Sequence, residues 1–264
     1  MKIQDIMHYI TYLRKNKKHL FTNYFLTYQD SDMDFPIWKG KETIIFLVCE
    51  EKIQRCFFAS TDEDELCALL KHMPTETVMD YITKEKRKEF CWLDTGFVLY
   101  RTLIRYTNLH LTDDPQTHKK SKRELFLEQF YDETIGGFAT INDAEELYKL
   151  LYSVFDFRVS RLPSMKELIK MIEKKWVLLY REQQEITAFL MYKIEGKKYY
   201  GYQIYNEGTA DITYNLEQKA ISYAKANYQV KSSYAWVETN NLGANERCEG
   251  SNFDGTYDYI FVKK

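Results

Sequence analysis

The chain has 264 residues, a length that allows one large domain or, as we expect here, two modest domains that each bury a core of their own. Apolar residues make up 45% of it and charged residues 29%, a balance that excludes wholesale disorder. The 37 basic and 39 acidic side chains give a formal net charge of −2, so no overall field draws the molecule to nucleic acid or to an anionic membrane.

The five cysteines are odd in number, and no two stand at a metal-ligand spacing, which predicts a reduced, cytoplasmic protein without a metal site. No stretch is apolar over the roughly 18 residues that a membrane span requires. Residues 1–18 are already polar and charged. We therefore expect a protein that is neither secreted nor anchored in a membrane.

In chain order, the first half begins with an amphipathic segment in which Ile6, Tyr9, Ile10 and Leu13 recur at helical spacing. Alternating apolar runs on either side of a polar pair then predict a hairpin. The elements expected here are a helix over 3–18, strands over 21–28, 43–49 and 54–59, a helix over 61–71, a strand over 76–83, a helix over 85–93, and a strand or pair of strands over 97–109.

A polar stretch that lacks apolar periodicity and contains Pro115 follows at residues 112–122, which predicts a linker. Residues 123–131 carry an apolar side and predict a short connecting helix. The predicted organisation is an N-terminal domain over 1–111, a linker with its connecting helix over 112–135, and a second domain over 136–264.

The second half is more regular, and two capping patterns mark its first helices: Asn142 with Glu145, and Ser164 with Glu167. Three strands with tight polar connections come next, and a helix, a strand, a helix and a strand complete the order βααβββαβαβ. The strands are expected over 137–140, 176–181, 186–194, 199–205, 233–238 and 257–263, and the last helix over 241–250.

This order resembles the GNAT (GCN5-related N-acetyltransferase) superfamily. Asn241, Ala244 and Phe253 fit the family segment Asn-x-x-Ala-x-x-x-Tyr-x-x-x-Gly-Phe, whereas Cys248 stands in place of the tyrosine and Asn252 in place of the glycine. The resemblance covers about half of the chain, roughly from residue 136 onward. It implies an α/β (α+β) fold with a mixed central sheet flanked by helices.

The end of the first half is similar to the segment that closes a GNAT domain, since Gly96 and Phe97 precede a strand with Tyr100, Arg101 and Thr102. The resemblance thus implies two tandem GNAT-like domains, of which the N-terminal one is degenerate. Tandem GNAT folds occur in Fem-like peptidoglycan aminoacyltransferases and in some bacterial acyltransferases, which implies a bacterial-type protein.

The resemblance implies an N-acyltransferase that moves an acyl group from a pantetheine thioester to an amine of a small molecule, amino acid or peptide. In the family the pantetheine arm lies between the splayed fourth and fifth strands, and the pyrophosphate lies at the N-terminus of the next helix, where amide donors and the helix dipole face an anion. The donor is then acetyl-CoA, another acyl-CoA, or the acyl-phosphopantetheine of an acyl carrier protein. The donor-binding positions carried over are Gln203, Ile204, Tyr205, Asp211, Ile212, Thr213, Asn241 and Ala244.

The turn before that helix departs from the glycine-rich family pattern. Residues 208–214 read GTADITY, with Asp211 and Thr213 near the expected glycines. A carboxylate there repels phosphate, which favours a carrier-bound donor because it lacks the phosphoadenosine of coenzyme A. The alternative interpretation is that Asp211 or Thr213 caps the helix.

Acyl transfer needs a base for the amine, donors for the thioester oxygen and an acid for the departing thiolate. Three catalytic candidates follow. Tyr205 belongs to a strand whose alternation places it on one face with Gln203 and Tyr199, Glu238 ends the fifth strand, and Cys248 takes the position of the family's proton-donating tyrosine. The alternative interpretations are ring packing, exposed surface and an inert buried thiol, respectively.

Two other functions stay open from the sequence. No histidine occurs after His118, so the common base is missing from the second half, which is compatible with a non-catalytic binding or scaffold protein. Fem-like transfer of an amino acid from tRNA is disfavoured, because RNA binding usually requires a basic footprint that this chain lacks.

Overall fold

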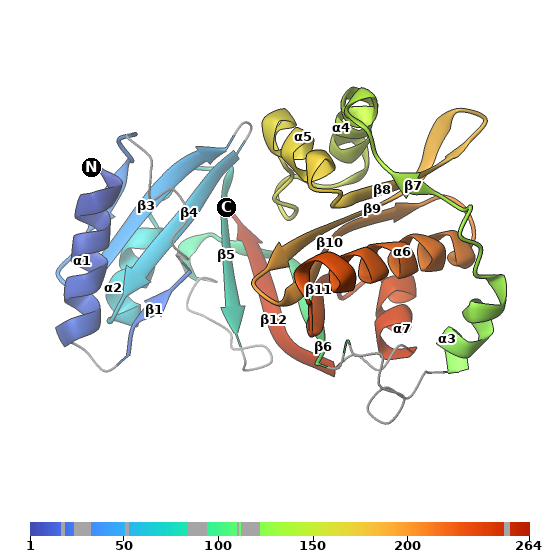
Figure 1. Ribbon diagram of the computed structural model, residues 1–264. Helices are drawn as coiled ribbons and strands as arrows, with labels where there is room; N and C mark the ends of the chain where they lie inside the picture. Colours follow the sequence, from blue (N-terminus) through green and yellow to red (C-terminus); the bar gives the residue numbers. More distant parts are fainter. Residues whose placement is uncertain are drawn as a thin grey trace. The chain divides into compact units, whose positions relative to one another are not determined.

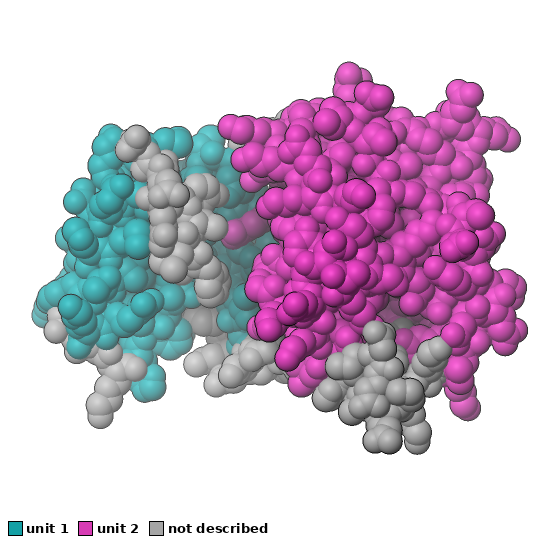
Figure 2. All heavy atoms as spheres, in the orientation of Figure 1, with its two compact units in different colours: residues 1–103, 257–264 teal, residues 104–256 magenta. Residues whose placement is uncertain are grey.

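The computed structural model describes residues 1–16, 19–23, 33–50, 53–83, 94–109, 111, 122–250 and 254–264. The chain divides by its contacts into two compact units, which Figure 2 colours separately. Unit 1 comprises Met1–Leu103 with Tyr257–Lys264, and unit 2 comprises Ile104–Thr256. The contacts thus place the C-terminal strand with unit 1, whereas the sequence-based division kept it in the second domain. The sequence-based domain boundaries stay a prediction.

The described residues of unit 1 form two helices and a sheet, labelled in Figure 1. Its elements are α1 (Ile3–Asn16), β1 (Phe21–Thr22), β2 (Ile37–Lys39), β3 (Thr43–Glu50), β4 (Ile53–Ser60), α2 (Glu63–Leu70), β5 (Thr77–Thr83), the first part of β6 (Val98–Asn108) and most of β12 (Asp254–Lys263). The predicted hairpin is β3–β4, paired antiparallel throughout. The predicted helix over 85–93 lies outside the described residues.

Helices α1 and α2 contribute to different cores because β3 and β4 alternate their side chains between two faces. Ile6 and Ile10 of α1 pack with Phe46 and other residues of one face. Leu66 and Leu70 of α2 belong to the cluster on the opposite face. The apolar stripe predicted for the first helix is therefore its buried side.

The C-terminal strand completes the sheet of unit 1. Residues 258–263 of β12 pair antiparallel with β5, and the sheet order is β2-β3-β4-β5-β12. Among the described cysteines, Cys49, Cys56 and Cys248 are free, whereas Cys67 is disulfide-bonded. The expectation of a fully reduced chain is therefore wrong at Cys67.

Unit 2 follows the order that the sequence predicted up to its last strand. Its elements are the second part of β6, α3 (Lys122–Leu127), η2 (Glu128–Phe130), β7 (Gly137–Phe138), η3 (Ile141–Asp143), α4 (Ala144–Val154), α5 (Met165–Glu173), β8 (Val177–Glu182), β9 (Glu185–Glu195), β10 (Lys198–Asn206), α6 (Ala210–Tyr228), β11 (Ser232–Glu238) and α7 (Leu242–Gly250). The strand order is β6-β11-β10-β9-β8-β7. The predicted linker over 112–122 lies almost entirely outside the described residues.

Helices cover both faces of this sheet. Figure 1 shows α4 and α5 on one side of β8–β10 and α6 on the other. Leu147 of α4 and Leu168 of α5 pack with Phe189 in one core, and Leu216 and Ala220 of α6 belong to the core of the opposite face. We call these the α4/α5 face and the α6 face.

The two predicted helix starts had different outcomes. Ser164 and Glu167 form the predicted capping box, with the Ser164 amide 2.8 Å from a Glu167 carboxylate oxygen. The first start lies earlier than predicted, because Thr140 and Asp143 form the box in place of Asn142 and Glu145. Asp143 is well placed for this role because Arg181 binds its other carboxylate oxygen and so fixes the side chain.

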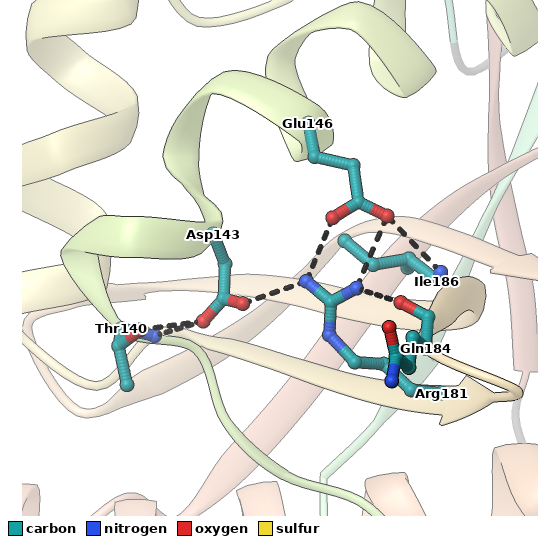
Figure 3. A network of polar contacts seen from close by, with 6 residues as sticks. All are labelled: Thr140, Asp143, Glu146, Arg181, Gln184 and Ile186. Carbon is teal, nitrogen blue, oxygen red and sulfur yellow. Dashed lines mark hydrogen bonds and ion pairs between the residues drawn. The ribbon is translucent and has the colours of Figure 1, made fainter.

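Arg181 ties the start of α4 to the β8–β9 hairpin (Figure 3). Its guanidinium lies 2.7 Å from Asp143 Oδ1 and 2.8 Å from Glu146 Oε2, and it also donates to the Gln184 carbonyl. The Ile186 amide donates to Glu146 as well. Partly exposed side chains thus lock a helix terminus onto a strand pair, in the bidentate geometry that favours arginine.

Replacing Arg181 with methionine should lower the free energy of unfolding, because its ion pairs and hydrogen bonds are lost. The expected loss is only about 1 kcal/mol, since solvent screens partly exposed ion pairs. The hydrogen bond with Arg181 lowers the pKa of Glu146, and the pKa of Asp143 is also lowered: burial opposes the change, but Thr140 and Arg181 outweigh it. A lowered pKa stabilises the fold above the unfolded value near 4 and stops doing so as pH falls through the folded pKa. Urea titrations at pH 7 and pH 3 should show the difference between wild type and variant shrinking at pH 3; an equal difference at both pH values would contradict the ion-pair account.

Candidate functional site

Strands β10 and β11 of unit 2 run parallel and then separate. They pair from Lys198 opposite Ser232 to Gly201 opposite Ala235. β10 continues to Asn206 and β11 to Glu238, and within the described residues these continuations have no strand pairing with each other. Within the described residues, the edge of residues 202–206 that faces β11 therefore has no strand partner where the two strands part.

A β-bulge in β10 coincides with this separation. Gly201 opposes Tyr192 of β9 and Gln203 opposes Met191, so Tyr202 is the additional residue. A bulge bends its strand and increases the local twist, which explains why β10 leaves β11 here.

The bulge also changes which side chains share a face. Gln203 and Tyr205 oppose Met191 and Phe189 on the α4/α5 face, which confirms that these two lie together. Tyr199 is buried in the core of the α6 face. The predicted placement of Tyr199 on the face of Tyr205 is therefore wrong, because one inserted residue inverts the alternation.

The turn between β10 and α6 is organised by Asn206, a residue that the sequence analysis did not identify. Its side-chain amide donates to the Thr209 carbonyl at 2.8 Å and to Thr213 Oγ1 at 2.9 Å, and its oxygen accepts from the Gly208 amide. An Asn two residues before a Gly is a recognisable turn signal that could have identified it.

The N-terminus of α6 is left without a side-chain cap. Thr209 is the N-cap residue and makes no side-chain cap bond. Thr213 is buried and accepts from Asn206, so the alternative in which Asp211 or Thr213 caps this helix is wrong. Amide donors of the first turn and the positive end of a 19-residue helix thus point into the turn. Asp211 is the one acid in this turn.

Unit 1 has a similar pair of parallel strands, but its own chain fills the gap. β4 and β5 pair only from Gln54 opposite Thr77 to Cys56 opposite Met79. Beyond that point β1 pairs with the end of β4. Asn23, only 1% exposed, then bridges both strands, because its side-chain amide donates to the Cys56 carbonyl at 2.9 Å and to the Asp80 carbonyl at 2.8 Å.

The helix after this gap also differs from α6. Asp62 caps α2 by accepting from the Glu65 amide, and Glu63 and Asp64 add further negative charge to the first turn. This terminus is satisfied and acidic, so it disfavours phosphate. The candidate donor site therefore belongs to unit 2.

Cys248 lies on α7, where it is 4% exposed and packs with Val237 and Tyr106. Burial raises the pKa of this thiol to about 11, partly offset by Arg247. Burial also raises the pKa of Tyr106, whose hydroxyl donates to Glu249, to about 12. These surroundings favour a packing role for Cys248.

The other carried-over residues near α7 shape its first turn. The Asn241 side-chain oxygen accepts from the Ala244 amide at 3.1 Å, as an N-cap does. Ala244 packs against the Cys248 cluster. Asn252 and Phe253, which the family segment also includes, lie outside the described residues.

The remaining predicted residues lie on β10, α6 and β11. Tyr205 stacks against Phe189 at 5.5 Å between ring centroids and donates to Glu207, a bond that chiefly raises its pKa, to about 12. Ile204 and Ile212 pack in the core of the α6 face, so only their backbone groups can meet a ligand. Glu238 ends β11, and its carbonyl accepts from the Asn245 side chain.

Metal binding and membrane-spanning helices were also considered for the described part of the chain. It contains no group of three or more potential metal ligands. None of its helices combines the length and the apolar character that crossing a membrane requires.

Comparison with known proteins identifies the fold. A GCN5-related N-acetyltransferase from Sphaerobacter thermophilus matches with a TM-score of 0.57 at 12% identity, over 89% of this chain and 83% of that one. A GNAT-family acetyltransferase from Colwellia psychrerythraea matches with 0.54 at 12% identity, over 100% and 98%. A tandem GNAT protein from the clavulanic acid biosynthesis pathway matches with 0.50 at 8% identity, over 86% and 80%.

No family model and no curated protein sequence matches this chain. At these identities the structural likeness concerns the fold alone. The chain has a GNAT-like fold with a mixed sheet flanked by helices, and a tandem GNAT protein is among its structural neighbours. The predicted fold class is confirmed.

Proposed function

We propose that unit 2 is an N-acyltransferase that takes an acyl group from a pantetheine thioester. One observation carries the proposal: β10 and β11 part at Gly201 and Ala235, directly before a helix whose N-terminus has no side-chain cap. An unpaired strand edge suits the amide groups of a pantetheine arm, and an uncapped helix N-terminus suits a phosphate. The acetyltransferase names of the structural neighbours agree with this chemistry.

The donor would meet backbone groups more than side chains. Gln203, Ile204 and Tyr205 would offer the edge of β10, and Asp211, Ile212 and Thr213 the first turn of α6. Asn241 and Ala244 would border the arm from α7. The acid at Asp211 opposes phosphate, which keeps a phosphopantetheine on an acyl carrier protein as a donor beside acetyl-CoA or another acyl-CoA.

In the reaction, the amine nitrogen bonds to the acyl carbon, the carbon–sulfur bond breaks, and the sulfur leaves as a thiolate that must gain a proton. We assign the proton donor to Tyr205, a phenol on the part of β10 that lies beyond its pairing with β11. Glu238, where β11 ends, is our candidate for accepting the proton that the amine loses.

Titration calorimetry with acetyl-CoA, S-acetylpantetheine and an acetylated carrier protein tests the proposal. We expect one donor per chain, since the gap in unit 1 is filled. Replacing Tyr205 with phenylalanine should lower kcat at least tenfold and leave donor affinity unchanged. If no donor binds, the proposal fails; if donors bind without turnover over a broad panel of amines, the protein is the non-catalytic GNAT-fold binding protein that the sequence left open.

Cys248 stands where the resemblance places a proton donor, so it remains a candidate acid. Its burial instead predicts that the thiol only packs against its neighbours. Cys248→Ala should cost about 1 kcal/mol of stability, because a small cavity forms beside Val237 and Tyr106. Turnover per folded molecule should not change. Melting curves and steady-state rates check this; a large fall in kcat with unchanged stability would restore the thiol to the mechanism.

The acceptor is an amine of a small molecule, amino acid or peptide, and we propose a cytoplasmic location, which cell fractionation would test. Fem-like transfer from tRNA stays a minor alternative on the grounds of charge. Bound RNA in freshly purified protein would support that alternative.

A further inference from the structure

Lys193 of β9 brings an amine to the point where β10 and β11 part. It follows Met191 by two residues, so strand alternation puts its side chain on the α4/α5 face of unit 2. Its Nζ lies 3.6 Å from the centroid of the Tyr202 ring. Tyr202 is the bulge residue and the first one beyond the last pair of β10 with β11. An amine of the protein itself therefore lies beside the parting strands.

A row of aromatic rings fixes the position of this amine. The Tyr202 ring meets the Tyr200 ring edge to face, with ring centroids 5.7 Å apart. Tyr200 in turn stacks on Tyr234 of β11, with ring centroids 4.6 Å apart. The row joins β10 to β11, and the Lys193 ammonium contacts its Tyr202 end. The negative face of a ring attracts a cation, so the ring releases the nitrogen more readily once it is neutral.

The surroundings of Lys193 favour an uncharged amine more than water does. The side chain is only partly exposed. Burial chiefly lowers the pKa of its ammonium, although the charges of Glu167 and Glu195 oppose this change. These two acids have hydrogen-bond partners of their own, because Glu167 accepts from the Ser164 hydroxyl and Glu195 accepts from the Tyr234 hydroxyl. A larger fraction of Lys193 is thus a neutral, nucleophilic amine than of a fully hydrated lysine.

The proposed donor would bring its thioester to the same place. Its phosphates would meet the first turn of α6, which begins at Ala210, soon after β10 ends at Asn206. The pantetheine arm would then run back along the edge of residues 202–206 toward the parting point. The thioester at the end of the arm would lie near Tyr202, whose ring contacts Lys193. The flexible four-carbon stem of lysine lets the Nζ leave the ring and reach the acyl carbon.

We propose that Lys193 is a self-acylation site, which accepts an acyl group from the thioester donor bound to the same chain. The inference rests on the proposed acyl transfer and adds a modification site to it. The neutral Nζ bonds to the acyl carbon, the carbon–sulfur bond breaks, and the proton that the nitrogen loses goes to the thiolate. The products are an acyl-lysine and a free pantetheine thiol, so no further reactant is needed. Because an amide is much more stable than a thioester, the modification persists.

Mass spectrometry of the intact chain after incubation with acetyl-CoA or S-acetylpantetheine tests this proposal. We expect one rapidly added acetyl group per chain, and peptide mapping should place it on Lys193. Lys197 is the internal control, because it is an exposed lysine between β9 and β10. A bound thioester acts at a high effective concentration, so Lys193 should react about tenfold faster than Lys197 or more. The rate constant should not depend on protein concentration, since the donor and the amine belong to one complex.

Matched variants and a competitor connect the modification with the donor site. Lys193→Arg keeps a cation for the Tyr202 ring but removes the reactive amine, so it should abolish the rapid acetylation. Lys197→Arg should leave the rapid acetylation unchanged. Coenzyme A without an acyl group should protect Lys193 but not Lys197, because it would occupy the donor site.

Calorimetric titration with the same two donors separates this inference from the proposed function. If a donor binds and Lys193 reacts no faster than Lys197, the self-acylation inference is wrong although acyl transfer stands. Rapid acetylation that coenzyme A does not slow would also refute the inference, because the reaction would then not use the bound donor. If neither donor binds and Lys193 reacts no faster than Lys197, the proposed function and this inference fail together.

Discussion

Replacing Arg55 with methionine should lower the free energy of unfolding of unit 1 by about 3–5 kcal/mol, the largest stability effect that we expect in this protein. Arg55 on β4 is completely buried, and its guanidinium lies 2.7 Å from Glu50 and 3.0 Å from Asp80. Asp80 on β5 is 2% exposed and also accepts from the Tyr259 hydroxyl of β12. Four strands, β3, β4, β5 and β12, therefore meet at this buried arginine and its partners.

The expected loss of stability arises from the buried carboxylate of Asp80, which Arg55 no longer neutralises in the variant. Without Arg55, Asp80 would be a buried charge with the neutral Tyr259 hydroxyl as its remaining partner in this set, and desolvation of such a charge is costly. Burial by itself would lower the pKa of Arg55, but Asp80 and Glu50 outweigh it and raise that pKa above its ordinary value. In the wild type, the attraction between Arg55 and these carboxylates thus offsets the cost of burying the charges.

Urea unfolding of four variants separates the contributions. Arg55→Met leaves the buried Asp80 carboxylate without its arginine and should be strongly destabilised, whereas Asp80→Leu leaves Arg55 its ion pair with Glu50 and should cost less. The double variant should recover much of the loss because neither of the two buried charges remains. Tyr259→Phe should cost only about 1–2 kcal/mol, the value of one hydrogen bond to a charged group. Additive losses in the double variant would contradict the paired-charge account.

Replacing Thr209 with aspartate should raise the melting temperature and at the same time weaken acetyl-CoA binding about 10- to 100-fold. Thr209 is the N-cap of α6 in extended backbone geometry, φ −85° and ψ 160°, but it makes no side-chain cap bond. Aspartate is a stronger N-cap than threonine and would add up to about 1 kcal/mol of stability. The same carboxylate would lie where the pyrophosphate is proposed to bind and would repel it.

Thr209→Asn is the matched control, since asparagine caps a helix as well as aspartate does but carries no charge. It should raise the melting temperature with little change in donor affinity. Calorimetric titration of both variants with acetyl-CoA and with S-acetylpantetheine, which lacks the pyrophosphate, locates the effect. Equal weakening of both ligands by Thr209→Asp, or none at all, would place the phosphates elsewhere.

Local patterns in the sequence determined the elements of unit 2 and their order. Ser164 and Glu167 mark a helix start because both halves of a capping box lie within four residues. The β9–β10 hairpin is equally local, since its polar turn and alternating strands are adjacent in the chain. The order of elements from residue 137 onward was therefore predicted, and it carries the resemblance to the GNAT fold.

Tertiary structure decided what depends on partners distant in the sequence. The bulge at Tyr202 inverts the faces of β10, and neither strand alone reveals it, because it is defined by the register with β9. β12 pairs with β5 about 180 residues earlier, and no local pattern encodes that choice. In the sequence Arg55 looks like any surface arginine, and only the fold shows that it is buried and bonded to Asp80 of another strand.

The candidate site shows the same division. Asp211 and Thr213 were identified from their positions in the sequence. The structure shows that the Asn206 side chain donates a hydrogen bond to the Thr213 hydroxyl and that no side chain caps the N-terminus of α6. Asn23 fills the gap in unit 1 because its amide reaches two strands at once. Sequence determined which residue types stand on each strand and helix, because propensity and periodicity act over a few residues. Only tertiary structure decided which strand gap the chain itself fills, because that depends on hydrogen bonds between segments far apart in the chain.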